Sequence, residues 1–280
     1  RSLYWSWRAL SFRASEQALT IIHDKMDQNK TMLPRLEKLA KSVWRGERLK
    51  VSVTGALMHG HGTGALGHFS IEFWHDDSNF HVGSLNHVLK TLEDSSEDNW
   101  GHLRDTTRPE CAWGSTILDS AALKTKVTKK SGQLYDVPPK EIARPKKLPR
   151  RLYLQLDNCA GQNKNRFVFS YLSYLVWQGV FDEVQLGFMM VGHTHDDIDA
   201  LFGNYSTLMK RSDALTIPEL MQLFRECNKQ KAPAPYLVHE VPDRKGFVKG
   251  YIPEKKERLV GHLEPLLFKF CQKDGWPLMF

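Results

Sequence analysis

Three aspartates occupy positions from which their side chains could converge on a metal ion. Asp24 and Asp157 each follow a short apolar run typical of a buried strand, and Asp199 lies one turn into a segment with helical spacing. Sites in open α/β sheets form at strand ends. Because clustered carboxylates repel one another, they favour a hard cation such as Mg²⁺ or Mn²⁺, which prefers oxygen ligands. We therefore predict a two-metal site, with ions about 3.5–4 Å apart, that cuts or joins phosphodiesters.

Neighbouring acids compete for these roles. An aspartate just past a strand commonly forms an Asx turn or caps a helix, so each of the three also has a purely structural interpretation. Asp27 lies three residues beyond Asp24, and Asp196 and Asp197 precede Asp199 at the start of the same predicted helix. Asp196 is well placed to cap that helix. The spacing alone leaves the choice among these acids open.

Two groups of histidines are candidates for a different kind of metal site. His193 and His195, followed by Asp197, resemble the H-x-H-x-D-H pattern of metallo-β-lactamase-fold hydrolases, although Ile198 replaces the last histidine. Such a hydrolase is a lesser alternative. A second group lies in and after a glycine-rich stretch, where a solvated turn is the default interpretation. Its members are His59, His61 and His68.

Amide and basic side chains are candidates for contacts with nucleic acid. The loop after Asp157 carries Asn158, Gln162 and Asn163, whose amides could hydrogen-bond a phosphate or a base edge. Between positions 124 and 151, ten basic residues oppose two acidic ones, a local charge of +8 that exceeds the +7 of the whole chain. A solvated linker and a strip facing nucleic acid explain this run equally well. Its last basic residues are Lys146, Lys147, Arg150 and Arg151.

The elements that must position these residues follow from the apolar pattern. Strand patterns cover residues 18–23, 49–57, 68–74, 152–156 and 184–191. Helical spacing covers residues 84–92, 163–176, 196–209 and 218–227. The order is strand, hairpin, helix, strand, helix, strand, helix, which is the ribonuclease H order. We therefore expect an α/β fold with a mixed five-stranded sheet flanked by helices.

The same pattern predicts how the chain is divided. Residues 1–17 form a lead-in segment, residues 18–212 the ribonuclease-H-like domain, and residues 213–280 a helical or irregular appendage. Residues 93–150 are polar, charged and proline-containing, and they are too long for an ordinary connection. We expect them to form a basic insertion outside the core, before the fourth strand.

Composition narrows the class of protein. With 280 residues, 41% of them hydrophobic, the chain can bury one substantial core. Its longest apolar stretches fall short of the roughly 20 residues that span a membrane. The first residue, Arg1, indicates a fragment from which targeting information is missing. The four cysteines form no C-x-x-C pair, which disfavours a disulfide scaffold and a zinc knuckle and indicates a reducing compartment. They are Cys111, Cys159, Cys227 and Cys271. We expect an intracellular protein, nuclear if the source is eukaryotic.

Three blocks of sequence resemble the signature of an uncharacterised, transposon-associated domain family with a ribonuclease-H-like fold. They are IIHDKMDQNKT (residues 21–31), LDNCAGQNKNR (residues 156–166) and GHTHDDIDALFG (residues 192–203). The stretches VSVTGALMHGHG and FWHDDSNFHVGSLNHVL are similar to the family as well. The resemblance spans residues 18–210, and it depends on the combination of blocks rather than on any one of them.

This resemblance implies which residues form the site. The third block of the family has Gly-His, five variable positions and then Asp, which selects His193 and Asp199. The other blocks select Asp157 and Asp24, with Asp27 as a frequent second acid. The resemblance implies a transposase-like or nuclease-like domain that cleaves or joins nucleic acid, most readily DNA, at a two-metal site. His193 would orient water, phosphate or a metal-bound carboxylate. The alternative is an inactive, domesticated module that binds nucleic acid or protein.

Overall fold

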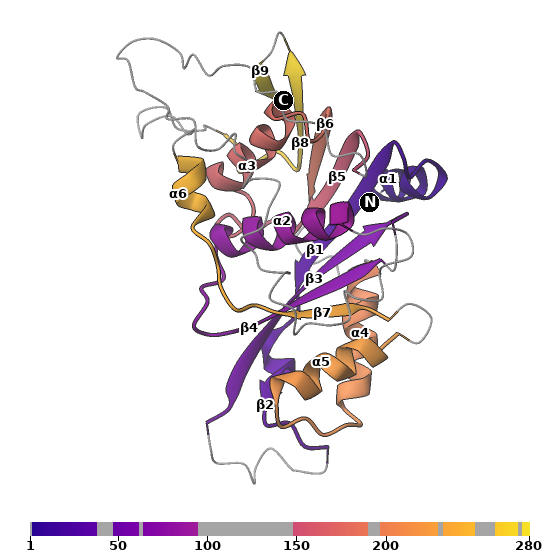
Figure 1. Cartoon of the computed structure of the whole chain (residues 1–280), viewed down its shortest axis with the longest axis vertical. Coiled ribbons are helices and arrows are strands. Elements are labelled where there is room, and N and C mark those ends of the chain that lie inside the picture. The colour runs from indigo at the N-terminus through magenta and orange to yellow at the C-terminus, as the bar shows by residue number, and fades with distance from the viewer. Residues whose placement is uncertain are drawn as a thin grey trace.

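A mixed β-sheet with helices on both faces forms the centre of the computed structural model (Figure 1). The structure describes residues 2–37, 47–61, 64–94, 148–189, 197–228, 232–249, 261–273 and 276–280. The expected basic insertion, residues 93–150, lies almost entirely outside these ranges. No helix within the described ranges is long and apolar enough to cross a membrane.

Within the described residues the sheet has nine strands, in the order β7-β4-β3-β1-β5-β6-β8-β9, with the short β2 paired to β3. Their bounds are β1 Ala18–Lys25, β2 Met32–Leu33, β3 Leu49–His59, β4 Ala65–Ile71, β5 Arg151–Leu156, β6 Glu183–Phe188, β7 Ala234–Leu237, β8 Leu267–Lys273 and β9 Trp276–Met279. Strand β1 is antiparallel to β3 and parallel to β5, and β5 is parallel to β6.

The α/β class and the mixed sheet flanked by helices are therefore confirmed. The expected count of five strands is wrong, because the C-terminal part of the chain adds strands at both edges of the sheet. Strand β7 pairs with β4 at one edge, and β8 and β9 extend β6 at the other. The region expected as an appendage thus contributes three strands to the sheet.

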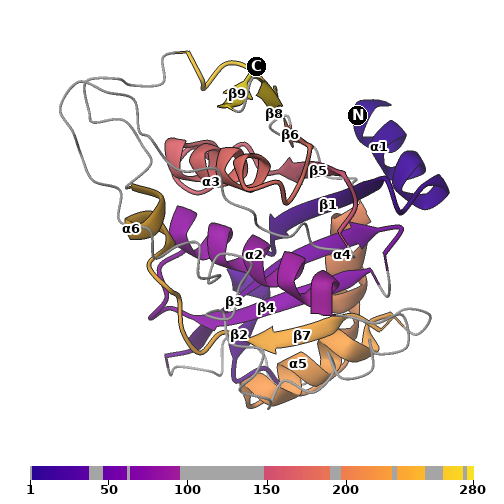
Figure 2. The same ribbon diagram turned by 45° about the horizontal axis from the view of Figure 1, so that its top comes forward.

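Helices cover the two faces of the sheet (Figure 2). Their bounds are α1 Ser2–Arg13, α2 Ser78–Asp94, α3 Arg166–Trp177, α4 Asp197–Met209, α5 Ile217–Glu226 and α6 Arg244–Lys249, with the short 3₁₀ helix η1 at Gln28–Lys30. Side chains alternate between faces along a strand. In β1, Ile21 belongs to the core cluster under α2 and α3, whereas Ile22 belongs to the cluster under α4 and α5.

Local sequence sets where the helices begin. The Asn165 side chain accepts hydrogen bonds from the Phe167 and Val168 amides, at 3.0 and 3.3 Å, and so starts α3. Helix α3 therefore begins three residues later than the pattern predicted. Thr216 and Glu219 form a capping box that starts α5.

A glycine lets α4 approach the middle of the sheet. A Cβ added at Gly55 of β3 would lie 2.9 Å from the Phe202 ring and 3.2 Å from Ile198. Gly55 is the pairing partner of Asp24 in β1. The first turns of α4 therefore pack directly beside the strand position that carries Asp24.

Candidate functional site

Asp24 and Asp157 lie next to each other at the carboxyl ends of two adjacent parallel strands. His23 of β1 pairs with Leu156, the last residue of β5, and Asp24 and Asp157 directly follow this pair. Adjacent strands are about 4.8 Å apart, and residues in register point to the same face. That face is the one to which Ile22 and Ile198 belong, the face covered by α4. Parallel pairing therefore places the two aspartates at the same edge of the sheet.

A pocket of about 510 Å³ opens at this edge of the sheet. Five of the predicted site residues line it, namely Asp24, Asp27, Asp157, Gln162 and Asn163. The other lining residues are Lys25, Met26, Gln28, Asn29, Lys50 and His81. We call this the carboxylate pocket. Ten of its eleven lining residues are polar or charged, and three of them are acidic.

The carboxylates of Asp24 and Asp27 also hold backbone groups. Asp24 Oδ1 accepts the Lys25 amide hydrogen at 2.8 Å. Asp27 Oδ1 accepts from the backbone and the side-chain amide of Asn29, both at 3.0 Å, and thereby caps η1. Asp27 thus forms the turn that caps η1, and its Oδ2 takes no part in these bonds.

Asn163 presents an oxygen beside Asp157. Its side-chain Nδ2 donates to the Asp157 carbonyl at 3.3 Å. The side chain is buried, and within the described part of the chain its Oδ1 has no hydrogen-bond partner. Leaving a buried acceptor without a partner costs about 1–3 kcal/mol. An unsatisfied oxygen in the wall of a carboxylate-lined pocket is a feature expected of a ligand site.

Asp76, which the sequence analysis did not single out, organises the wall behind the carboxylates. It accepts hydrogen bonds from Lys25 Nζ, from His81 Nε2 at 2.9 Å and from Gln162 Nε2 at 2.8 Å. Burial alone would raise the pKa of Asp76, but the bonds from His81 and Lys25 hold it at about 2. The carboxylate is therefore charged, and it fixes three side chains that line the pocket.

A signal for Asp76 is present in the sequence. Two consecutive acids, Asp76 and Asp77, precede α2. Asp77 alone caps the helix, since its Oδ1 accepts the amide hydrogens of Asn79 and Phe80 at 2.8 and 3.3 Å. Asp76 therefore has no capping role. An acid that is not needed to cap the helix could have marked this position as part of a site.

A chain of buried hydrogen bonds runs inward from the strand position next to Asp24. His23 Nε2 bonds Ser84 Oγ at 2.8 Å, Ser84 Oγ bonds His68 Nδ1 at 2.9 Å, and His68 Nε2 bonds His87 Nδ1 at 2.9 Å. Burial lowers the pKa of His23 to about 3 and that of His87 to about 4, and it holds the pKa of His68 well below its usual value. These histidines are therefore neutral near pH 7.

The expectation of a solvated turn is wrong for two of the glycine-flanked histidines. His59 is the last residue of β3 and His68 lies within β4, and both are buried. Each is at a strand position whose face is covered by helices, which the glycine-rich sequence between them did not reveal. His61 is half-buried and donates to the Ala18 carbonyl at 3.1 Å.

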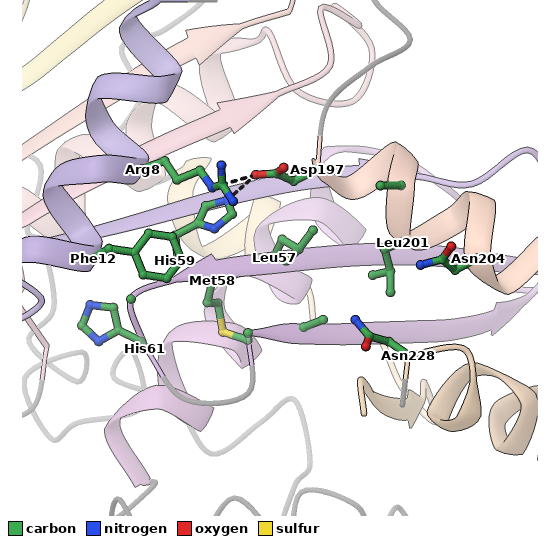
Figure 3. Close-up of a pocket in the computed structure, with 14 residues that line it drawn as sticks. Arg8, Phe12, Leu57, Met58, His59, His61, Asp197, Leu201, Asn204 and Asn228 are labelled. Carbon is green, nitrogen blue, oxygen red and sulfur yellow. Dashed lines mark ion pairs between the residues drawn. The ribbon is translucent and has the colours of Figure 1, made fainter. Parts of the chain in front are cut away.

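Asp197 is fully engaged away from the carboxylate pocket (Figure 3). Its Oδ2 accepts from Tyr4 Oη at 2.9 Å, pairs with Arg8 Nε at 3.0 Å and lies 3.5 Å from His59 Nε2. Asp197 therefore ties the start of α4 to α1 and β3. Asp199 is two residues further on, about 200° around the helix, and so lies on the opposite flank of α4. Asp199 is not among the residues that line the carboxylate pocket.

Several predicted site residues lie elsewhere. Arg150 and Arg151 are exposed at the start of β5, and Arg151 is six residues, or about 20 Å, along the strand from Asp157. Arg150 faces Asp182 there, at 3.8 Å. Asn158 is half-buried and does not line the pocket. His193, Lys146 and Lys147, like His195 and Asp196, lie outside the described residues.

No three His, Cys, Asp or Glu side chains form a group that could hold a metal ion within the described ranges. The oxygen donors of the carboxylate pocket therefore do not include a group of three acidic, histidine or cysteine side chains. Asp24 and Asp157 supply carboxylates, and Gln162 and Asn163 supply amide oxygens.

Comparison with known protein families gives one match. Residues 138–279, which are 142 of its 280 residues, match the model of a domain of unknown function, DUF7869. The chain belongs to the DUF7869 family. Asp157 and Asp199 lie inside the DUF7869 match, whereas Asp24, Asp27 and Asp76 precede it. The carboxylate pocket is thus built jointly by the DUF7869 region and by the strands before it. No curated protein and no solved structure gives a significant match to the chain.

Proposed function

We propose that the chain is a ribonuclease-H-like, metal-dependent enzyme that cleaves or joins phosphodiesters in nucleic acid, in the manner of a nuclease or transposase. One observation carries the proposal: Asp24 and Asp157 directly follow the paired residues His23 and Leu156 of two adjacent parallel strands, and both line one polar pocket. The spatial order of the central strands, β4-β3-β1-β5-β6, supports the fold, because the predicted hairpin lies on one side of β1 and two parallel strands lie on the other.

The donor set fits Mg²⁺ or Mn²⁺. Both ions prefer oxygen ligands, and Mg²⁺ is commonly held by one or two protein carboxylates together with substrate phosphates and water. Asp24 and Asp157 would supply the carboxylates, and the unsatisfied Oδ1 of Asn163 would supply a neutral oxygen. When bound, such ions activate a water or a 3′-hydroxyl and stabilise the leaving oxygen.

The remaining lining residues suit an anionic strand. Lys50 lies at the pocket with half of its side chain exposed, and its partner Glu72 is 3.2 Å away on the exposed surface. Lysine binds phosphate as a point charge. Gln162 is held in place by Asp76, so its amide is oriented before a ligand arrives. Pre-oriented groups bind with a smaller loss of conformational entropy.

Asp199 and His193 complete the proposal. Because Asp197 is held by α1 and β3, Asp199 is the acid of the first turn of α4 on the flank turned away from that cluster. Helix α4 contacts both β1 and β3. We assign Asp199 as the third carboxylate and His193 as the group that orients water or phosphate.

An inactive module that binds nucleic acid or protein is the second candidate. The observation in its favour is that Asp24 and Asp27 already accept hydrogen bonds from backbone amides. Aspartates with such bonds can be retained for the turn alone. The two candidates differ in whether the pocket binds a divalent ion and turns over a substrate.

The test combines metal binding with turnover. Calorimetric titration with Mg²⁺ and Mn²⁺ should show binding to the full chain, and end-labelled single- and double-stranded DNA and RNA should be cut or joined only when the ion is present. Asp24→Asn and Asp157→Asn should each lower the rate by more than the roughly 10- to 100-fold typical of an outer-shell residue. Asp182→Asn, an exposed acid at the other end of the sheet, is the matched control. Nucleic-acid binding without metal binding or turnover would favour the inactive module.

A further inference from the structure

A second pocket lies on the flank of α4 that carries Asp197 (Figure 3). It has a volume of about 420 Å³ and lies between α1, α4 and the end of the β3–β4 hairpin. Its lining shares no residue with the carboxylate pocket. Thr20 of β1 pairs with His59 and Asp24 pairs with Gly55, so the two sites are four residues, or about 13 Å, apart along the strands.

The middle of this second pocket is apolar and its ends are polar. Leu57, Met58 and Leu201 form the middle, as Figure 3 shows. Asn204 and Asn228 stand at one end, and Arg8, His59 and Asp197 meet at the other. An amide side chain both donates and accepts hydrogen bonds. The lining therefore suits a ligand with an apolar body and an edge that carries donors and acceptors.

The permanent charges of the second pocket are paired. Arg8 and Asp197 are 3.0 Å apart, so one cation is matched by one anion. His61 donates to the Ala18 carbonyl, and burial lowers the pKa of His61, which keeps the ring neutral at pH 7. Because the Arg8 guanidinium is already paired, the pocket does not select a phosphate through an unmatched cation.

An exposed aromatic ring stands at the rim. Phe12 of α1 is 54% exposed, and its ring lies 5.7 Å from the ring of His59 at an angle of 56°. Arg8 lies over the rings of both Trp5 and Phe12, 4.7 and 5.6 Å from their centroids. Exposed aromatic rings beside hydrogen-bonding side chains are the usual platform on which flat heterocycles stack.

We propose that this second pocket binds a nucleobase, stacked against Phe12 at one end, with the Asn204 amide at the other end hydrogen-bonding the attached sugar. The base can come from a free nucleoside or from an unpaired position of a single strand. The inference does not depend on catalysis in the carboxylate pocket, because no lining residue is shared.

The experiment is a binding titration of the full chain by ligand-observed NMR. The probes are adenosine, guanosine, cytidine and uridine, and a short unstructured oligonucleotide. Nucleoside binding that saturates at about millimolar concentration supports a pocket for the free molecule. Saturation by the oligonucleotide alone, with an affinity that Phe12→Ala lowers, supports a base presented by a strand. If neither probe shows saturable binding, the proposal is overturned.

Matched variants locate the binding. Phe12→Ala should weaken it roughly tenfold, since a stacked base loses about that much when its aromatic partner is removed. Asn204→Ala should weaken it as well, and both residues are exposed, so neither change disturbs the core. Phe73→Ala, at a more exposed ring away from the pocket, should leave binding unchanged. Equal affinity in wild type, Phe12→Ala and Asn204→Ala would overturn the proposal.

Discussion

Asn163 donates its side-chain N–H to the backbone carbonyl of Asp157 and leaves its own oxygen in the wall of the pocket that the two residues share. A carboxylate and an unsatisfied amide oxygen are thus held together by the loop that joins β5 to α3. Because Asp157 and Asn163 are both candidate metal ligands, binding of a divalent ion is the most direct test of the carboxylate pocket.

Magnesium or manganese should stabilise the folded chain. At about 100 times the dissociation constant, a bound ion adds about 2.7 kcal/mol, which corresponds to a rise in Tm of about 5 °C or more. Asp157→Asn should abolish this rise with little change in the metal-free Tm, because Asp157 is exposed. Differential scanning calorimetry of wild type, Asp157→Asn and the control Asp182→Asn gives the comparison. An equal rise in all three would place the ion elsewhere.

Asp76→Asn should destabilise the fold by about 1–3 kcal/mol, because Lys25 and His81 lose the charge that they share. The folded pKa of Asp76 is about 2, below its ordinary 3.8, so its contribution is complete above about pH 4 and is lost only as the pH falls toward 2. Urea unfolding should therefore show the same difference between wild type and variant at pH 5 and pH 8. A difference that disappears between those values would contradict the assigned pKa.

Acid should unfold the chain through its buried histidines. The folded pKa values of His23, His68 and His87 lie below the ordinary 6.5. As the pH falls, these histidines therefore become protonated in the unfolded chain before they do in the folded chain. Stability should be greatest above pH 6.5 and should fall as the pH drops toward 4, by about 1.4 kcal/mol per pH unit for each proton. Urea unfolding at pH 4.5, 5.5 and 7 measures the slope. His87→Gln should reduce the proton uptake by about one; an unchanged slope would count against His87.

Two glycines near α4 should respond in opposite ways to alanine. Gly55→Ala places a Cβ against Phe202 and Ile198 and should cost about 1–3 kcal/mol. Gly203→Ala, within α4, meets nothing within 4 Å and should stabilise the helix by about 0.5–1 kcal/mol. Chemical denaturation of both variants tests the packing of α4 on β3. Two variants of equal stability would show that α4 does not approach the sheet so closely.

Lysine and arginine at opposite ends of the sheet should differ in their effect on nucleic-acid binding. If the strand lies over the carboxylate pocket, Lys50→Gln should reduce the dependence of log affinity on log salt by about 0.9 on duplex DNA, and Arg151→Gln should not. Fluorescence anisotropy at several salt concentrations measures both slopes. A larger effect of Arg151→Gln would indicate that nucleic acid binds at the start of β5 instead.

The sequence indicated the central strands because their apolar runs are short, β-branched and bounded by turns, and it indicated the site because aspartates follow two of those runs. It could not reveal that β1 and β5 pair in the register that sets Asp24 beside Asp157, since pairing across 125 intervening residues leaves no local pattern. The role of Asp76 was hidden for the same reason. Its partners Lys25 and Gln162 come from two other elements.

The edge strands were missed for different reasons. In β8, buried Phe268 and Phe270 alternate with exposed Leu267 and Lys269, so a strand pattern was present and was not recognised. Strand β7 contains Pro235, which disfavours a central strand, and the structure places it at the edge, where proline is tolerated.

The stretch matched by the family model and the unit that folds are not the same. Residues 138–279 hold β5 to β9 but omit β1, which pairs with β5, and β4, which pairs with β7. A fragment cut at the family boundary would expose the hydrogen-bonding edge of β5 to solvent, and such an edge readily pairs with other chains. It would also carry Asp157 while leaving Asp24 behind. Assays on that fragment alone would therefore report on an aggregating half-site, whatever the intact chain does.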